Sequence, residues 1–271
     1  MSFKSDEQIS FFCPICNLNS INDESCLKWP RDYLACSNCG SAVRERSLFL
    51  SLILNSDYKS KIIHESSPSI DRSYHEKFKN ECSNYTFSQY FNDIPNGEKN
   101  SKGILSANLE NLPFTDESID IFLSLDVFEH LWNPIKAFKE VYRVLKNNGK
   151  FILTFPIDNG FNKTEKPVTI ENPNIIIPTK AGIYKGFTEC LEYHGNPVDP
   201  NGSLVTYYYG YDIIEIIKKN TDFKVDLMFL HDIEQFGIVG VMNECFVLTK
   251  NEIISPELLS NTKKDYYNNL K

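Results

Sequence analysis

Residues 106–156 read SANLENLPFTDESIDIFLSLDVFEHLWNPIKAFKEVYRVLKNNGKFILTFP, a pattern that predicts a strand, a helix and a second strand in succession. Residues 119–125 are almost continuously apolar, which is typical of a parallel strand covered on both faces. A second apolar strand is expected at residues 150–155. In open parallel sheets, ligands bind beyond the carboxyl ends of the strands. The sequence therefore predicts a site just after residue 125.

A crossover helix is expected between these two strands. Asn133 suits the N-cap, and Pro134 suits the first helical position, where its missing N–H costs least. Apolar residues recur three and four positions apart and form one face, namely Ile135, Phe138, Val141, Tyr142 and Leu145. We expect the Asn-Asn-Gly sequence that ends at Gly149 to terminate the helix, because these residues accept a left-handed C-cap.

The sequence LPFTDESIDIFLSLDVFEHL at residues 112–131, with RVLKNNGKFILTFP at residues 143–156, resembles class I S-adenosylmethionine-dependent methyltransferases of the type 11 branch. The resemblance implies an α/β, Rossmann-like sheet of seven strands with an antiparallel last strand, and S-adenosylmethionine as cofactor. It places a further helix at residues 211–219. The last two strands are expected at residues 224–230 and 245–250.

Composition limits the classes of function. The chain has 271 residues, a formal net charge of -8 and 8 cysteines. It has no apolar run that could span a membrane, and residues 1–10 lack the features of a signal peptide, so a cytoplasmic protein with reduced or metal-bound cysteines is expected. The acidity makes nucleic acid an unlikely partner and favours a small-molecule acceptor.

The chain divides into four expected parts. Residues 1–42 form a zinc-ribbon-like domain, and residues 43–60 form a connecting helix. Residues 61–250 form the methyltransferase domain, in which residues 157–206 are long and rich in proline, glycine and asparagine, as in a loop that covers the acceptor. Residues 251–271 are expected to be a polar tail.

Two Cys-x-x-Cys pairs predict a metal site in the first part. Cys13 and Cys16 are followed, about twenty residues later, by Cys36 and Cys39, a spacing that can close a tetrahedral zinc site. Four sulfur ligands leave no open position, so the zinc is predicted to be structural and to supply folding free energy. Cys26 is a possible substitute ligand, although single cysteines are more often buried apolar residues.

The expected cofactor loop lacks glycine, which is the largest departure from the family pattern. In its place the chain has His64, Glu65, Ser66 and Ser67. Glu65 suits the cofactor's ammonium group, and the two serines suit its carboxylate. Ser67 with Pro68 also suits the start of a helix. The sequence HESSP resembles a zinc-knuckle subgroup of the type 11 branch. That subgroup also carries EYHGNP and GSLVT, present here at residues 192–197 and 202–206.

Further cofactor contacts are expected from strand ends. The second strand is predicted at residues 85–90, and its polar end would face the ribose through Ser88, Gln89 and Tyr90. The resemblance implies that Asn108 reads the adenine amino group and that Leu109 packs on the ring. Leu125 and Asp126 complete the predicted cofactor-binding set.

The chemistry is predicted to centre on Asp126, Glu129, His130 and His194. Methyl transfer to a hydroxyl needs alignment of the acceptor and removal of a proton, and either histidine could be the base. Small-RNA 2′-O-methyltransferases and ubiquinone-pathway O-methyltransferases resemble this site in placing such residues around a divalent ion. The same four residues could therefore hold a cation. Alternatively, Glu129 and His130 only support the start of a helix.

Three functions remain open. The first is an O-methyltransferase acting on a small acceptor, such as a sugar, sugar-nucleotide or phosphate-containing precursor in bacterial surface glycan (capsule) biosynthesis. The second is an rRNA methyltransferase that uses the ribbon for RNA recognition, and the third is a non-catalytic S-adenosylmethionine-binding module. Arg44 and Arg46 could hold an anionic acceptor group, although pairing with nearby acids is the more frequent role.

Overall fold

The structure is a computed structural model that describes residues 8–157, 163–172, 175–178, 191–196 and 198–251. Its centre is a sheet of seven strands in the order β12-β13-β7-β6-β3-β4-β5. β13 pairs antiparallel with both β12 and β7, and the pairs from β7 to β5 are parallel. The predicted α/β sheet with an antiparallel last strand is confirmed.

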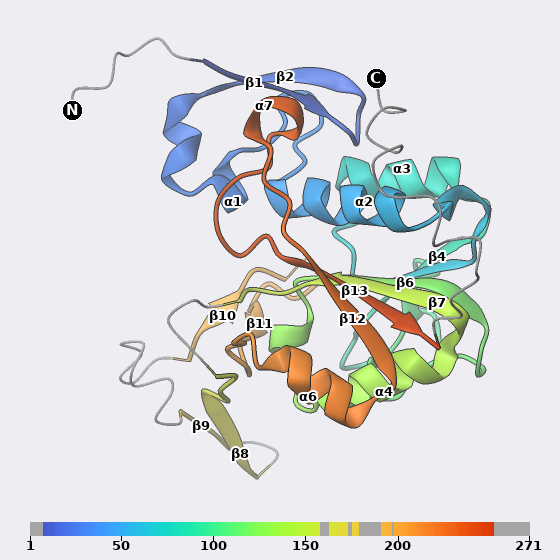
Figure 1. Cartoon of the computed structure of the whole chain (residues 1–271). Coiled ribbons are helices and arrows are strands. Elements are labelled where there is room, and N and C mark those ends of the chain that lie inside the picture. Colours follow the sequence, from blue (N-terminus) through green and yellow to red (C-terminus); the bar gives the residue numbers. More distant parts are fainter. Residues whose placement is uncertain (1–7, 158–162, 173–174, 179–190, 197, 252–271) are drawn as a thin grey trace.

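Helices separate most of the strands of this sheet along the chain (Figure 1). In chain order the strands are β3 (Ile63–Ser66), β4 (Tyr85–Gln89), β5 (Leu105–Ser106), β6 (Ile119–Leu125), β7 (Leu145–Thr154), β12 (Phe223–Met228) and β13 (Cys245–Lys250). The helices that flank them are α2 (Val43–Asn55), α3 (Ser73–Glu81), α4 (Pro134–Val144) and α6 (Ile213–Asn220).

Helices cover both faces of the sheet (Figure 1). α2 and α3 lie on one face and α4 and α6 on the other, and each face has its own buried apolar cluster. On β6, Leu123 belongs to the first cluster and Phe122 to the second. The apolar run at residues 119–125 is therefore explained by burial on both sides.

The N-terminal part is a small module on the α2 side of the sheet (Figure 1). It contains the antiparallel hairpin of β1 (Gln8–Cys13) and β2 (Leu18–Asp23), a 3₁₀ turn at Glu24–Lys28 and α1 (Pro30–Tyr33). α7 (Ile233–Phe236), from the far end of the chain, packs on β1. Gly237 ends α7 with φ of +62°, and a Cβ there would lie 2.6 Å from the Phe11 ring. Glycine is therefore required at this contact.

Several predicted element boundaries are wrong. α4 ends at Val144, and β7 begins at Leu145, so the helix never reaches Gly149. α3 begins at Ser73 and not at Pro68, since residues 67–72 form bends and a turn between β3 and the helix. The predicted Asn133 cap is confirmed, since its side chain accepts from the Lys136 amide.

α2 is more than the connector predicted at residues 43–60. Leu48 and Leu52 are fully buried in the cluster that lies on the sheet. A short 3₁₀ helix, Tyr58–Ser60, follows α2 and leads into β3. Ala42 is the N-cap of α2, and its amide donates to Glu45 Oε2.

The described residues of the predicted insertion form two small hairpins. β8 (Val168–Asn172) pairs with β9 (Ile175–Pro178), and β10 (Tyr193–His194) pairs with β11 (Ser203–Leu204). The EYHGNP and GSLVT sequences thus contain two partner strands of one hairpin. The predicted tail lies outside the described residues beyond Asn251. Within the described part of the chain, none of the helices combines the length and apolar character needed to span a membrane.

Candidate functional site

The four predicted zinc ligands come together in the N-terminal module. Their sulfur atoms all lie within 4.8 Å of one another. The Cys13–Cys39 and Cys16–Cys36 pairs are each separated by 3.7 Å. A tetrahedral site with Zn–S bonds of about 2.3 Å separates its sulfur atoms by about 3.8 Å, so the spacing fits zinc.

Local turns explain how the two cysteine pairs are aimed. The Asn17 amide donates to the Cys13 carbonyl, and the Gly40 amide donates to the Cys36 carbonyl. Asn17 and Gly40 both have positive φ, a conformation that asparagine and glycine adopt at low cost. Cys26 is buried but is not part of the four-sulfur group.

Arg46 ties this module to the rest of the protein. Its side chain is fully buried and donates to the backbone carbonyls of Ser41, Leu34, Phe236 and Gly237. These bonds engage all three of its nitrogen atoms, so Arg46 does not bind an anionic acceptor as the sequence suggested. It is a structural cation that satisfies carbonyl groups where three segments meet.

A cavity of about 380 Å³ opens at the carboxyl ends of β3, β4 and β6, where the sequence predicts a site. Its wall comes from the strand ends, from the 3₁₀ helix Phe128–His130 and from the β10–β11 hairpin. The predicted site residues that line it are Ser67, Gln89, Tyr90, Asn108, Leu109, Asp126 and His130.

The side of this cavity that the sequence predicts to hold the cofactor has a left-handed turn without glycine. Ser67 has φ of +51°, the conformation that glycine adopts most easily, and its amide donates to the Ser88 carbonyl at 2.8 Å. Gln89 is buried and donates to the Pro68 carbonyl at 2.7 Å. Asn108 accepts from the Glu110 amide at 2.8 Å, which leaves its NH₂ group and its second oxygen lone pair for a ligand.

Two predicted cofactor contacts, His64 and Glu65, point into the protein interior. His64 is bonded to Thr86 and Ser88, and burial lowers its pKa to about 3. Glu65 accepts from the hydroxyls of Tyr74 and Tyr85 on the α3 face, and burial raises its pKa to about 7. Neither side chain lines the cavity. The prediction placed both residues in a loop after the strand. Because β3 continues through Ser66, His64 and Glu65 are strand residues whose side chains point to opposite faces of the sheet.

The remaining predicted contacts are also outside the cavity wall. Ser66 donates weakly to the Leu123 carbonyl at 3.4 Å, and Ser88 bonds His64. Leu125 packs on the apolar cluster of the α2 face. Ser66, Ser88 and Leu125 support the strands whose ends bear the cavity.

Asp126 lines the cavity, but its carboxylate is already paired. Arg31 Nη2 and Arg44 Nε lie 2.5 and 2.9 Å from Oδ2, and the Thr154 hydroxyl donates to Oδ1 at 3.0 Å. These cations hold the pKa of the carboxyl below its ordinary value against the effect of burial. Arg44 therefore pairs with acids, which the sequence analysis took as the more frequent role.

Glu129, His130 and His194 form a compact group without Asp126. Glu129 is only 2% exposed, and neither of its carboxylate oxygens has a partner at hydrogen-bond distance. Its Oε1 lies 3.7 Å from both His130 Nε2 and His194 Nδ1. The two rings are perpendicular, with centroids 5.1 Å apart. The four-residue cation site predicted from the sequence is thus wrong in including Asp126.

The two histidines differ in their setting. His130 lines the cavity, and its Nδ1 lies 2.9 Å from the Leu204 carbonyl oxygen. Because a carbonyl only accepts, Nδ1 carries a proton, so in the neutral imidazole Nε2 holds the lone pair. His194 is next to His130 but does not line the cavity, and Glu129 and then Glu192 raise its pKa to about 9. His194 is therefore protonated at neutral pH and cannot accept a proton there.

The raised pKa of His194 links its charge to folding. A histidine whose pKa is higher in the folded protein contributes stability that is fully present below its unfolded pKa, about 6.5. That contribution is lost as the pH rises through about 9. The ion pair between His194 and Glu129 is therefore intact at neutral pH.

The hairpin that brings His194 into place is set by one glycine. Gly202 has φ of +81°, and a Cβ there would lie 2.5 Å from the His194 carbonyl oxygen. The Thr206 amide and hydroxyl both donate to the Glu129 carbonyl, at 2.7 and 3.0 Å. Asn196 and Asp199 also line the cavity and were not predicted as site residues, although they lie in or beside the EYHGNP sequence.

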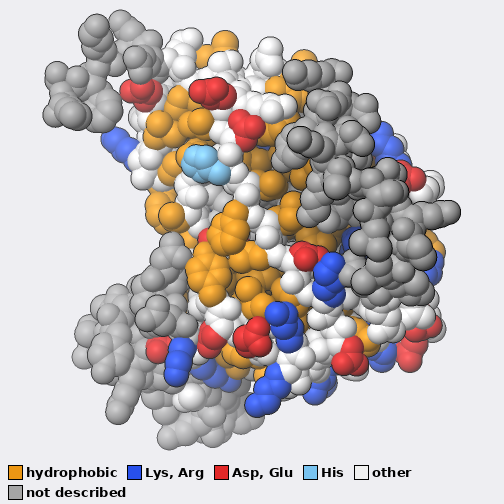
Figure 2. Space-filling view, in the orientation of Figure 1, with side chains coloured by type: hydrophobic (Ala, Val, Ile, Leu, Met, Phe, Trp, Pro, Cys, Tyr) orange, Lys and Arg blue, Asp and Glu red, His pale blue; other side chains and the backbone are white. Residues whose placement is uncertain are grey.

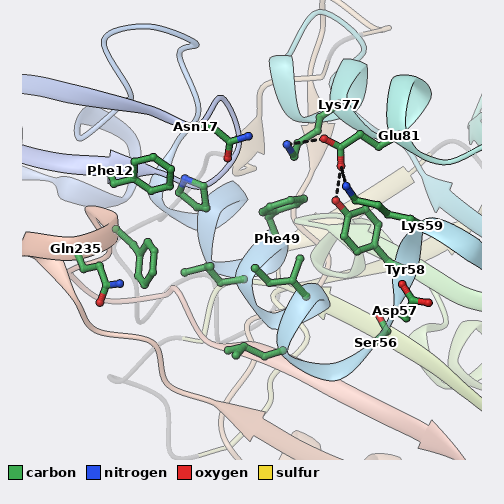
Figure 3. A pocket seen from close by; sticks show the side chains of 15 residues that line it. Phe12, Asn17, Phe49, Ser56, Asp57, Tyr58, Lys59, Lys77, Glu81 and Gln235 are labelled. Carbon is green, nitrogen blue, oxygen red and sulfur yellow. Dashed lines mark hydrogen bonds and ion pairs between the residues drawn. The ribbon is translucent and has the colours of Figure 1, made fainter. Parts of the chain in front are cut away.

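A second, larger cavity of about 860 Å³ lies between the N-terminal module and helices α2 and α3. In Figure 3, Phe12 and Gln235 face Phe49 from one side, and Tyr58, Lys59 and Lys77 gather around Glu81 on the other. These polar groups pair with one another. None of the predicted site residues lines this cavity, so its greater size does not make it the better candidate for the chemistry.

Comparisons with known proteins bear on the central part of the chain. A family model described as a methyltransferase domain matches residues 71–153. A "Probable S-adenosylmethionine-dependent methyltransferase" of Mycobacterium tuberculosis is 36% identical over 99 residues, which are 34% of this chain and 36% of that protein. These matches support a class I methyltransferase domain. The family match begins after β3 and therefore leaves out the glycine-free loop.

Further similar proteins are also methyltransferases by name. A ubiquinone/menaquinone biosynthesis C-methyltransferase of Rickettsia prowazekii is 34% identical over 91 residues, or 32% of this chain and 35% of that protein. The matches span between about a fifth and a third of the length of the curated relatives. A solved methyltransferase from Mesorhizobium loti is 10% identical with a TM-score of 0.46, covering 77% of this chain and 97% of that one.

Proposed function

We propose that the protein is an S-adenosylmethionine-dependent O-methyltransferase that acts on a small acceptor in the cavity at the ends of β3, β4 and β6. The supporting observation is the position of His130, which lines that cavity with its Nε2 lone pair free. The cavity's volume of about 380 Å³ is within the usual range for small-molecule sites. S-adenosylmethionine would supply the methyl group, bound between Ser67, Gln89 and Asn108.

In this proposal each residue has a distinct task. His130 would accept the proton of the acceptor hydroxyl as the hydroxyl oxygen bonds the methyl carbon and the methyl–sulfur bond breaks, with S-adenosylhomocysteine as the leaving group. Glu129 lies beside it, and with protonated His194 it fixes the ring and balances the charge that His130 gains. The Leu204 carbonyl holds the tautomer that leaves Nε2 free.

The acceptor class is part of the proposal. A sugar, sugar-nucleotide or phosphate-containing precursor of bacterial surface glycan would present hydroxyls to His130 in a cytoplasmic enzyme. Amide, carboxylate and hydroxyl groups of Asn196, Asp199 and Ser203 line the hairpin side of the cavity and suit a polyhydroxyl ligand.

An rRNA acceptor is less well supported. The net charge is -8, and on the face shown in Figure 2 the described Lys and Arg side chains are interspersed with Asp and Glu. A protein that follows a phosphate backbone presents a continuous basic surface. A purely binding role fits poorly with a free imidazole nitrogen in the cavity wall.

The first prediction concerns the cofactor. Purified protein is expected to bind S-adenosylhomocysteine with one site per chain in a calorimetric titration. Asn108→Ala is expected to weaken binding about tenfold, because it removes the donor and acceptor placed near the adenine. Asn55→Ala, on α2 and outside this cavity, is the matched control. Equal affinity of Asn108→Ala and the control would remove Asn108 from the cofactor site.

A divalent cation is the second candidate feature of the site, and Glu129 favours it. A buried carboxylate without a hydrogen-bond partner, beside two imidazole nitrogens, is a suitable donor set. The Nδ1 bond of His130 to a carbonyl is the orientation that histidine ligands usually have. Bound there, the ion would polarise the acceptor oxygen. His130 would then be a ligand in place of the base.

The second prediction separates these two roles of His130. If an ion binds at Glu129, His130 and His194, titration of Mn²⁺ into the chelated protein should give one site that Glu129→Gln abolishes. Mn²⁺ should also raise the melting temperature of the wild type and leave that of Glu129→Gln unchanged.

The matched control for this titration is Glu192→Gln. Glu192 Oε1 lies 3.3 Å from His194 Nε2, but Glu192 is outside the group of three possible ligands. The control should therefore keep the Mn²⁺ site. Absence of Mn²⁺ binding in the wild type would leave His130 as the base.

The cysteine cluster completes the proposal. Cys13, Cys16, Cys36 and Cys39 are proposed to bind one structural Zn²⁺. The fit of their sulfur spacing to a tetrahedron supports this assignment.

A further inference from the structure

Two arginines from the N-terminal part of the chain reach the end of β6. Arg31, on α1, and Arg44, on α2, both contact Oδ2 of Asp126, at 2.5 and 2.9 Å. Sequence separations of 95 and 82 residues make this a tertiary contact between the module and the sheet. The Thr154 hydroxyl, from β7, occupies the other carboxylate oxygen.

The arginines are themselves held in place. Arg31 has a side chain only 11% exposed, and its Nε donates to the Met242 carbonyl at 3.1 Å. Arg44 Nη1 donates to the Arg31 carbonyl at 3.3 Å, and both arginines contact Asp32. The two guanidinium groups are therefore held in position by contacts other than those to Asp126.

Asp126 needs such support because its backbone is strained. Its φ is +53°, in the left-handed region that a non-glycine residue adopts at a cost and keeps only where its surroundings hold it. Its amide donates to the Thr154 carbonyl at 3.0 Å. This turn ends β6 and begins the segment Val127–His130, so it sets where His130 stands in the cavity.

We propose that Arg31 and Arg44 are positioning residues of the transfer site, and that the N-terminal module is thereby a working part of that site. They hold Asp126 in the left-handed turn from which the segment carrying His130 departs. The inference rests on the proposed function for its meaning in catalysis. Its structural part can be tested without any acceptor. This part is the pair of contacts from Arg31 and Arg44 to Asp126, called the arginine clamp below.

The test compares three single variants and one double variant of the full chain. Arg31→Met keeps roughly the length of the side chain and removes its charge. Arg31→Lys keeps the charge but loses the planar guanidinium group, whose several nitrogen donors can bond more than one acceptor. Arg72→Met is the matched control, because Arg72 also bonds the module, at the Gly40 carbonyl, but is not among the partners of Asp126. Amide hydrogen exchange of residues 127–131 and affinity for S-adenosylhomocysteine are measured for each.

The clamp predicts a local and graded effect. In Arg31→Met, amides 127–131 should exchange at least tenfold faster and S-adenosylhomocysteine should bind at least tenfold more weakly. Arg31→Lys should recover part of both, and Arg72→Met should stay within twofold of the wild type. Adding Asp126→Asn to Arg31→Met should restore slow exchange in part, because an amide needs no countercharge.

Two outcomes would overturn the proposal. One is exchange of residues 127–131 in Arg31→Met within twofold of the wild type. The other is an equal effect of Arg31→Met and Arg72→Met, which would reflect general loosening of the module. If the wild type does not bind S-adenosylhomocysteine, the proposed function fails, but the exchange comparison still decides whether the clamp exists.

Discussion

His130→Ala is expected to lower the rate of methyl transfer by about 10²- to 10⁴-fold, the usual contribution of a general base. The reason is geometric. His130 is the histidine that lines the cavity, and its Nε2 is free because the Leu204 carbonyl binds the proton on Nδ1. His194 cannot take over at neutral pH, because Glu129 and Glu192 raise its pKa to about 9.

The measurement is the initial rate at which labelled methyl passes from S-adenosylmethionine into the small-molecule fraction of a cell extract. His231→Ala is the control, since His231 is exposed and lies in the β12–β13 connection outside the described cavities. S-adenosylhomocysteine affinity should be nearly the same in both variants, which would separate chemistry from binding. Full turnover by His130→Ala would exclude it as the base.

Cys16→Ser or Cys36→Ser is expected to abolish zinc binding and unfold the N-terminal module. Structural zinc in small domains supplies about 10–16 kcal/mol of apparent folding free energy, and one lost thiolate removes much of it. The module also holds Arg31, so loss of zinc should weaken S-adenosylhomocysteine binding as well. Metal analysis, melting temperature and calorimetry on the same preparations measure these three effects.

Cys26→Ser is the matched control, because Cys26 lies in the same module but outside the four-sulfur group. It should keep one zinc per chain and a melting temperature close to that of the wild type. Much less than one zinc per chain in the wild type would contradict the zinc assignment. Retention of zinc by Cys16→Ser would contradict the ligand set.

Local sequence patterns predicted the sheet well where burial dictates residue type. The apolar run at residues 119–125 is typical of a strand covered on both sides, and it is β6 without change of boundaries. The two Cys-x-x-Cys pairs likewise predicted that the four cysteine sulfur atoms lie close together. Element ends were less predictable, because Leu145 suits a helix face as well as the start of β7.

The site was only partly predictable because its side chains depend on long-range contacts. The sequence could not show that β3 extends through Ser66, which turns His64 and Glu65 away from the cavity. It also could not show that Asp126 is neutralised by arginines 82 and 95 residues earlier. Ser67 supplies the left-handed turn usually left to glycine, and only the backbone angle reveals this.

Whether the cavity at the ends of β3, β4 and β6 holds the cofactor can be decided by calorimetric titration of S-adenosylhomocysteine into the purified, zinc-containing protein. Saturable binding at one site per chain is expected, and Asn108→Ala and Arg31→Met should each weaken it. Wild-type affinity is expected for Lys59→Ala, because Lys59 lines only the larger cavity. No binding by well-folded wild-type protein would contradict the proposed cofactor site.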